Sequence, residues 1–250
     1  MERFEKKIVL ITGGSGDIGS ATAERIMEEG GTCILSSIDE PGRKAVTEAL
    51  NAKGLKGSAE YCYCDAMDYA AFEKMAAEIS AKYGRLDVLA LCHGIERHHP
   101  IDELSIEDWQ AVIDVNLTST FLAIKACVPQ MKKQNYGRIA MVSSLGGRRG
   151  RPVVGANYAA SKAGMVGLTM LLGYELGPWN ITVNAVAPGP LNGRMSKSKT
   201  PEQVEKLLSD TRIHRLGEMW EIAAAIAYLS SDDAGWITGQ VLDINGGIHY

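Results

Sequence analysis

The sequence lacks the features that mark nucleic-acid-binding and membrane proteins. Lys and Arg number 26 against 30 Asp and Glu, so the net charge is −4 and there is no basic surplus to neutralise phosphates. The first residues contain neither a long apolar stretch nor a small-residue cleavage site. Apolar runs such as Ala223 to Leu229 are too short to span a bilayer. We therefore expect neither nucleic acid nor a membrane among its partners.

Cysteine is also scarce. The five cysteines form no Cys-x-x-Cys motif, and Cys62 and Cys64 lie two residues apart on a predicted strand. That spacing suits neither a disulfide nor a metal site. We therefore expect a reduced, cytoplasmic protein that binds no metal.

What the sequence does contain is a regular alternation of strands and helices. Short apolar runs predict strands at 7–12, 32–37, 60–64, 87–92, 138–143, 182–187 and 240–243. Helical periodicity predicts helices at 18–29, 41–53, 69–83, 106–133, 158–176 and 219–230. Such alternation is typical of right-handed βαβ units, so we expect an α/β protein of the doubly wound Rossmann type, with a parallel sheet and helices on both faces. Residues 1–250 contain no linker composition, which predicts a single domain with a substrate-loop insertion at about 190–215.

A glycine cluster lies between the first predicted strand and the first predicted helix, in Thr12-Gly13-Gly14-Ser15-Gly16-Asp17-Ile18-Gly19. Glycines at the first βα turn let the backbone approach a pyrophosphate, to which the helix start presents N–H groups. We expect this turn to bind a dinucleotide through Gly13, Ser15, Asp17, Ile18 and Gly19. The Asp17 carboxylate would repel a phosphate, so its side chain is expected to point away and cap the turn.

The end of the second predicted strand bears on the choice of dinucleotide. It reads Leu35-Ser36-Ser37-Ile38-Asp39, with no Arg or Lys before Arg43. An acidic residue here usually binds the ribose hydroxyls of NAD, whereas an Arg accommodates the 2′-phosphate of NADP. Asp39 therefore favours NAD, and Ser37 leaves NADP open.

Tyr158 and Lys162 lie four residues apart at the start of a predicted helix. Residues at this spacing share a helix face, so the phenol and the ammonium can converge on one point. A free Tyr titrates near ~10, and a neighbouring ammonium lowers the pKa of the phenol toward neutral pH. The pair alone is also common by chance on amphipathic helices.

Together these motifs resemble the short-chain dehydrogenase/reductase family, in its shorter single-domain branch. The resemblance runs from the Thr12–Gly19 turn to Asn245-Gly246-Gly247 near the end of the chain. It implies a seven-stranded parallel sheet and hydride transfer between a nicotinamide and a carbonyl or alcohol.

The resemblance also implies a catalytic set of four residues, Asn116, Ser144, Tyr158 and Lys162. Ser144 would hydrogen-bond the substrate oxygen and Tyr158 would donate the proton. Lys162 would hold the nicotinamide ribose and lower the pKa of Tyr158. Asn116 would distort its helix locally and help to hold a water that links Lys162 to solvent. The further dinucleotide contacts that the resemblance implies are Asp65, Ala66, Gly94, Pro188, Gly189 and Leu191, besides Tyr158 and Lys162.

Four features depart from the family pattern. Asp17 and Gly193 replace a usual glycine and a usual threonine. Leu91-Cys92-His93-Gly94 stands where Asn-Asn-Ala-Gly is typical, so packing by Leu91 and Cys92 is expected to replace the usual side-chain bonds of this strand. The loop between Ser144 and Tyr158 is one residue longer than usual.

Two charged groups of residues leave alternatives open. The basic residues Arg148, Arg149, Arg151, His98 and Arg194 suit either an anionic substrate or a solvated or subunit-contact surface. His93, His98, His99 and Glu96 have the chemistry of metal ligands, but their spacing fits no structural zinc pattern and a surface loop explains them as well.

The leading functional interpretation is an NAD-dependent dehydrogenase acting on an alcohol, such as a polyol or sugar-like substrate. An NADPH-dependent 3-oxoacyl-carrier-protein reductase is the alternative. A non-catalytic dinucleotide sensor would predict a decayed catalytic set, and the four residues are intact. In the family the helices at 106–133 and 158–176 pair with their copies in another subunit, so the resemblance implies a homotetramer.

Overall fold

Seven parallel strands form one sheet in the computed structural model of the protein, which describes residues 2–150, 154–197 and 200–248. Their order across the sheet is β3-β2-β1-β4-β5-β6-β7. The strands are β1 (Ile8–Thr12), β2 (Thr32–Ser37), β3 (Ser58–Tyr63), β4 (Val88–Leu91), β5 (Gly137–Val142), β6 (Ile181–Pro188) and β7 (Val241–Ile244). The expected fold class is confirmed.

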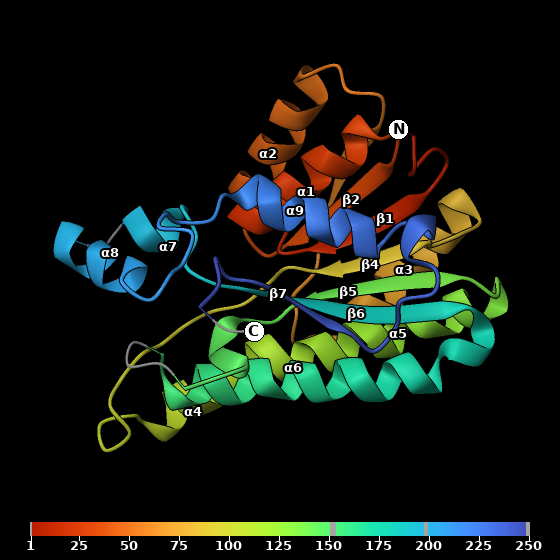
Figure 1. Ribbon diagram of the computed structural model, residues 1–250. Helices are drawn as coiled ribbons and strands as arrows, with labels where there is room; N and C mark the ends of the chain where they lie inside the picture. Colours follow the sequence, from red (N-terminus) through yellow and green to blue (C-terminus); the bar gives the residue numbers. More distant parts are fainter. Residues whose placement is uncertain (1, 151–153, 198–199, 249–250) are drawn as a thin grey trace.

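Helices cover both faces of this sheet (Figure 1). The helices that pack on it are α1 (Asp17–Glu28), α2 (Glu40–Ala52), α3 (Tyr69–Tyr83), α5 (Ser119–Lys133), α6 (Ala156–Glu175) and α9 (Met219–Leu229). Ile26 of α1 and Ile226 of α9 lie in the core on one face, whereas Phe72 of α3, Ile124 of α5 and Met165 of α6 lie in the core on the other. Strands buried on both sides explain the continuous apolar runs in the sequence, as in β1, all five residues of which are buried.

The predicted helix at 106–133 is interrupted in its middle. It comprises α4 (Ile106–Ile113), a π-helical turn at Asp114–Thr118 and α5. The whole stretch is long and apolar enough to cross a membrane by length and composition. In the fold, however, its buried side chains, such as Val112, Ala123 and Cys127, belong to the protein interior.

The strand order reverses between β1 and β4, where Thr12 pairs with Leu91 at the carboxyl ends of the two strands. In open parallel sheets ligands bind in the crevice outside this switch point. The segment expected as a loop insertion at about 190–215 lies beyond the same end of the sheet. It contains two helices that the sequence reasoning missed, α7 (Arg194–Lys197) and α8 (Pro201–Leu208), and a Thr200–Gln203 capping box begins the second.

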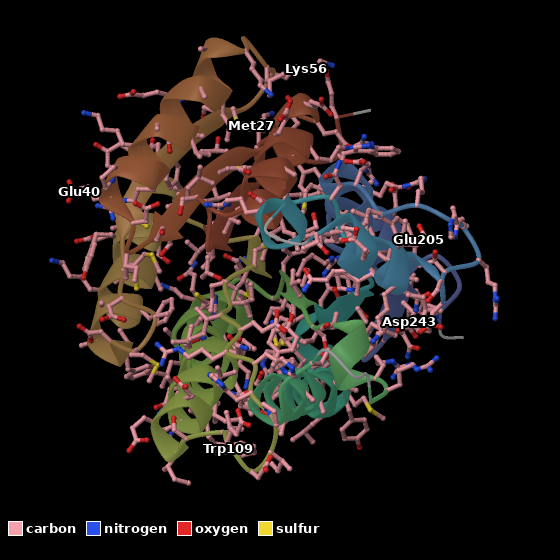
Figure 2. The ribbon with its side chains drawn as sticks, turned by 90° about the vertical axis from the view of Figure 1, so that its left-hand side faces the viewer. Met27, Glu40, Lys56, Trp109, Glu205 and Asp243 are labelled. Carbon is pink, nitrogen blue, oxygen red and sulfur yellow. The ribbon has the colours of Figure 1, made fainter. Side chains whose placement is uncertain are left out.

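Figure 2 looks at the molecule from the side on which α7 and α8 lie. Glu40, at the start of α2, and Glu205, on α8, lie on opposite flanks of this view, and Trp109 of α4 lies near its lower edge. Helices from both faces of the sheet therefore reach this side of the molecule.

Candidate functional site

The turn after β1 has the form of a phosphate cradle. Gly13 has φ +66°, and a Cβ there would lie 2.8 Å from the Cα of His93. A Cβ on Gly19 would lie 2.3 Å from the Gly13 carbonyl oxygen. Only glycine fits these positions, and the bare backbone between them leads into the N-terminus of α1. The turn thus fits the diphosphate of a dinucleotide, as the sequence predicts.

The end of β2 differs from the expectation for NAD. The Asp39 carboxylate accepts a hydrogen bond from Gly42 N at 3.1 Å and caps α2. This cap engages the carboxylate that was expected to bind the ribose hydroxyls of NAD. The Ser37 hydroxyl lies 3.0 Å from that of Ser15. Behind Ser37 lies the buried guanidinium of Arg43, which donates to the Ser37 carbonyl at 2.7 Å.

Two predicted dinucleotide contacts follow β3. The exposed Asp65 accepts a hydrogen bond from Met67 N at 3.0 Å through its carboxylate, and Ala66 packs against the core. Both therefore shape the turn at the carboxyl end of β3, the strand next to β2.

Buried polar side chains fix the start of α6, which carries Tyr158 and Lys162. Asn157 is fully buried; its Oδ1 accepts from Tyr158 N at 2.8 Å, and its Nδ2 donates to the carbonyls of Arg97 and Asp108. The Ser143 hydroxyl at the end of β5 donates to the Lys162 carbonyl at 2.8 Å. Helix α6 is thus tied to the chain after β4, to α4 and to β5. The sequence reasoning missed Asn157, although its amide, directly before Tyr158, is a possible capping signal.

Lys162 is buried beneath the crevice, where its Nζ donates to the Val142 carbonyl at 2.8 Å. Burial in this low-dielectric position lowers the pKa of its ammonium to about 8. Its Nζ lies 5.6 Å from the centroid of the Tyr158 ring.

The pKa of Tyr158 is not lowered as the sequence reasoning expects. Burial raises this pKa to about 12; a hydrogen bond with Ser144 opposes the rise and the Glu96 carboxylate adds to it. Lys162 is directed at a backbone carbonyl, and burial of the phenol outweighs any help from its charge. Without a bound dinucleotide, Tyr158 is therefore held as the protonated phenol, the form that can donate a proton.

Ser144 begins a short 3₁₀ turn at Leu145–Gly147, and its Oγ accepts from Gly146 N at 3.1 Å. Because this bond uses a lone pair, the hydroxyl hydrogen remains available to a partner in the crevice. The same backbone geometry therefore fixes the position of the Ser144 oxygen and leaves its donor function intact.

Asn116 lies fully buried in the π-helical turn. Its Nδ2 donates to the Ile95 carbonyl and to Ser161 Oγ, both at 3.0 Å, and its Oδ1 accepts from Ile95 N at 2.8 Å. The local helix distortion expected at Asn116 is present. A Cβ placed on Gly94 would lie 3.2 Å from Asn116 Oδ1 and 3.3 Å from Lys162 Nζ, so the glycine keeps open the space in front of both groups.

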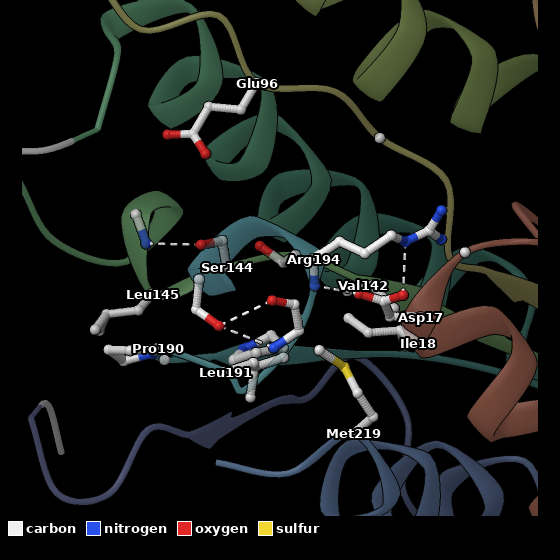
Figure 3. A pocket seen from close by; sticks show the side chains of 18 of the residues that line it. Asp17, Ile18, Glu96, Val142, Ser144, Leu145, Pro190, Leu191, Arg194 and Met219 are labelled. Atoms are coloured by element: carbon white, nitrogen blue, oxygen red, sulfur yellow. Dashed lines mark hydrogen bonds and ion pairs between the residues drawn. The ribbon is translucent and has the colours of Figure 1, made fainter. Parts of the chain in front are cut away.

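A cavity of about 360 Å³ lies at this end of the sheet (Figure 3). Of the predicted site residues, those that line it are Asp17, Ile18, Gly94, Ser144, Tyr158, Pro188, Gly189 and Leu191. Asn116 and Lys162 lie beneath its wall, as the Gly94 geometry shows. Apolar side chains also line it, among them Leu145, Val154, Leu207 and Met219.

His93 is not part of an open loop, and it adds side-chain bonds to the packing by Leu91 and Cys92 that the sequence predicts. Its Nδ1 lies 2.6 Å from Thr12 Oγ1 and its Nε2 2.5 Å from Ser119 Oγ. The one hydroxyl hydrogen of Ser119 goes to the Val115 carbonyl, so Nε2 must donate to Ser119. Burial lowers the pKa of the imidazole to about 4, so the ring is neutral and Nδ1 accepts from Thr12. His93 thus joins the ends of β1 and β4 to α5 as a neutral ring.

The other charged residues of the sequence analysis do not converge on one place. Arg148 pairs with Asp243 at 3.1 Å, and Arg149 donates to the Ile248 carbonyl, so neither supports an anionic substrate; Arg151 lies outside the described residues. His98 and His99 are exposed, unlike His93. Within the described part of the chain, no three His, Cys, Asp or Glu side chains are grouped as metal ligands.

The Asp17 carboxylate does not cap the turn as expected. It accepts hydrogen bonds from the backbone N and from Nε of Arg194, both at 2.7 Å, because the start of α7 lies directly across from it. The sequence had marked Asp17 and Gly193 only as separate departures from the family pattern.

Comparisons with known proteins agree with this geometry. Residues 14–249 match a family described as enoyl-(acyl carrier protein) reductase. The 3-oxoacyl-[acyl-carrier-protein] reductase of Escherichia coli (strain K12) is 37% identical over 246 residues, 98% of each chain. The enzyme of the same name from Thermotoga maritima is 39% identical over 247 residues, 98% of this chain and 99% of its own.

A solved structure is similar over the same length. That of the 3-oxoacyl-[acyl-carrier protein] reductase from Brucella melitensis has 34% sequence identity and a TM-score of 0.92, covering 98% of this chain and 92% of its own. The chain belongs to the short-chain dehydrogenase/reductase family. It is an oxidoreductase that acts on CH–OH groups with a nicotinamide cofactor.

Proposed function

We propose that the protein reduces the keto group of a 3-oxoacyl thioester or a similar apolar carbonyl compound, with NADPH as the hydride donor. The observation that carries this proposal is the lining of the cavity: Ser144 and Tyr158 face a space walled by Leu145, Val154 and Leu207. Such a wall favours an acyl chain over a polyol because apolar surface gains by leaving water. The names of the similar enzymes support the same substrate class.

The residues divide the work as follows. The nicotinamide supplies the hydride when bound. Ser144 donates a hydrogen bond to the substrate oxygen, and Tyr158 gives its proton to the same oxygen as negative charge develops there. Lys162 holds the ribose next to this site, and Asn116 in the π turn helps to keep a water beside Lys162.

NADPH is proposed because of the residues at the end of β2. The hydroxyls of Ser15 and Ser37 lie there, and the positive charge of Arg43 lies directly behind Ser37. Asp39, the residue that favours NAD, has its carboxylate engaged at the start of α2. A 2′-phosphate therefore meets hydroxyl donors and a nearby cation, and NADPH should bind more tightly than NADH.

A polyol or sugar-like alcohol with NAD is the second candidate. The Glu96 carboxylate lines the cavity beside Tyr158 and is the specific observation in its favour, because carboxylates bind neighbouring hydroxyl groups. A panel of acetoacetyl thioesters and polyols, assayed with both dinucleotides, separates the two candidates.

Tyr158→Phe tests the chemistry itself. Turnover of acetoacetyl-coenzyme A with NADPH should fall by about 10² to 10⁴, because the proton donor is lost. Binding of NADPH, followed by nicotinamide fluorescence, should stay nearly unchanged. Tyr228→Phe is the control, since Tyr228 lies on α9, is 38% exposed and does not line the cavity. Substantial remaining activity in Tyr158→Phe would contradict the mechanism.

We also propose a homotetramer in the cytoplasm. Met170, Leu171 and Tyr174 leave an exposed apolar strip along α6, and Phe121 adds to the exposed apolar surface on α5. Pairing of these helices with their copies would cover it. The five cysteines are free thiols, in keeping with a reducing compartment.

A further inference from the structure

Asp17 and Gly193, two departures from the family pattern, belong to one structural feature, the contact between Asp17 and Arg194. The Asp17 carboxylate accepts from the backbone N and Nε of Arg194, both at 2.7 Å, and Arg194 Nη2 donates to the Ser15 carbonyl at 3.0 Å. Figure 3 shows the two side chains meeting at one end of the cavity. These bonds join the segment at 190–215 to the glycine turn after β1.

Gly193 makes this junction possible. A Cβ at this position would lie 2.8 Å from Asp17 Oδ2 and 2.2 Å from Met219 Cε. The carboxylate therefore occupies the space that a side chain at position 193 would need. An acidic side chain at the start of α1, in this conformation, consequently requires a glycine at position 193.

The position of Asp17 creates an electrostatic problem that Arg194 solves. Asp17 is the first residue of α1, at the cradle where a diphosphate approaches the helix start. An uncompensated carboxylate there would repel the diphosphate. Arg194 cancels this charge, and its side chain remains 68% exposed on the cavity wall. A guanidinium has five N–H donors in a planar fork, of which the contacts with Asp17 and Ser15 occupy two.

We propose that Arg194 is a ligand of the cofactor diphosphate, and that Asp17 positions its guanidinium over the phosphate turn. The inference rests on the proposed function, since it concerns the nicotinamide cofactor of the same site. The residue that binds the cofactor then lies on the segment that also presents Leu191 and Leu207 to the substrate. Cofactor binding would therefore fix the substrate wall as well.

The test is a double-mutant cycle on cofactor affinity. Dissociation constants for NADPH and NADH are measured by nicotinamide fluorescence in the wild type, Arg194→Gln, Asp17→Asn and the double variant. Arg194→Gln should weaken binding at least about tenfold, because it removes a ligand and leaves Asp17 uncompensated. The double variant should bind more tightly than Arg194→Gln, since the repulsive carboxylate is gone. Arg194→Lys, which keeps the charge without the fork, should lie between the wild type and Arg194→Gln.

Arg215→Gln is the matched control. Arg215 is a half-exposed arginine of the same segment, paired with Glu221 at 2.7 Å and absent from the cavity lining. Its replacement should leave both dissociation constants unchanged. Wild-type affinity in Arg194→Gln would overturn the inference and leave the proposed function intact. Failure of the wild type to bind either dinucleotide would instead overturn the proposed function.

Discussion

Acid should destabilise this protein through His93. Burial, together with the charge of Lys162, lowers the pKa of this imidazole from 6.5 to about 4. In the unfolded chain a histidine titrates near ~6.5, so between these values the unfolded state binds a proton that the folded state does not. The stability that depends on neutral His93 is therefore complete above pH 6.5 and is lost as the pH falls toward 4. At about 1.4 kcal/mol for each pH unit, the loss is about 2 kcal/mol at pH 5 and about 3 kcal/mol at pH 4.

His93→Gln isolates this contribution, because a glutamine stays neutral throughout the range. Unfolding free energies of the wild type and the variant are measured in urea at pH 7.5, 6.5, 5.5 and 5.0, at one protein concentration. At pH 7.5 the wild type should be the more stable, since it keeps the bonds from His93 to Thr12 and Ser119. Its advantage should shrink by about 2 kcal/mol by pH 5.

The difference between the two proteins matters here, because other groups contribute equally to both curves. His98→Gln is the control: His98 is exposed, and its replacement should leave the pH dependence as in the wild type. An advantage of the wild type over His93→Gln that stays constant from pH 7.5 to 5 would refute the reasoning. It would mean that His93 protonates in the folded protein as readily as in the unfolded chain.

Two further substitutions test the packing beneath the cavity. Lys162→Met should raise the unfolding free energy at pH 7 by about 1 kcal/mol, because removal of the buried charge outweighs loss of the hydrogen bond to Val142. The same substitution should weaken NADPH binding. A variant that is less stable than the wild type in urea would contradict this. Gly147→Ala should cost about 2 kcal/mol or more of stability and most of the activity, because its Cβ would lie 2.5 Å from the Lys162 backbone carbon. Gly150→Ala is its control, because no atom of the residues that the structure describes lies within 4 Å of the added Cβ. Equal melting temperatures of the two variants would show that the contact relaxes.

The periodicity of the sequence determined the architecture. The strand at 32–37 and the helix at 69–83 have the predicted bounds, and the other predicted strands and helices differ from the structure by a few residues at most. The reason is that strands buried on both faces and helices buried on one face leave strong local patterns. A local distortion at Asn116 was expected only from the family resemblance, because helical periodicity continues through the π turn. The helices α7 and α8, of four and eight residues, are too short for helical periodicity to be recognised in the sequence.

The kinds of side chain at the site could also be predicted from the sequence. Ser144, Tyr158 and Lys162 occur in the order that the family pattern requires, and the glycine turn follows the first strand. The pKa values of Tyr158 and Lys162 were not legible, because they depend on burial and on the direction of the ammonium. The role of Asp39 was likewise decided by a neighbouring backbone N–H, which made it a helix cap.

Contacts between residues far apart in the chain were decided by the tertiary structure alone. Asp17 and Arg194 are 177 positions apart, and Thr12 and His93 are 81 apart. In the sequence alone, Asp17 and Arg194 are isolated charged residues near turns, and His93 is a histidine in a predicted loop. The parallel sheet brings the carboxyl ends of its strands to one edge. Only there do Asp17 and Arg194 form an ion pair, and only there does the half-buried His93 link two strands to a helix. Local sequence determines which elements form, because its patterns act over a few residues; the partners of the polar side chains depend on which strand ends the fold brings together.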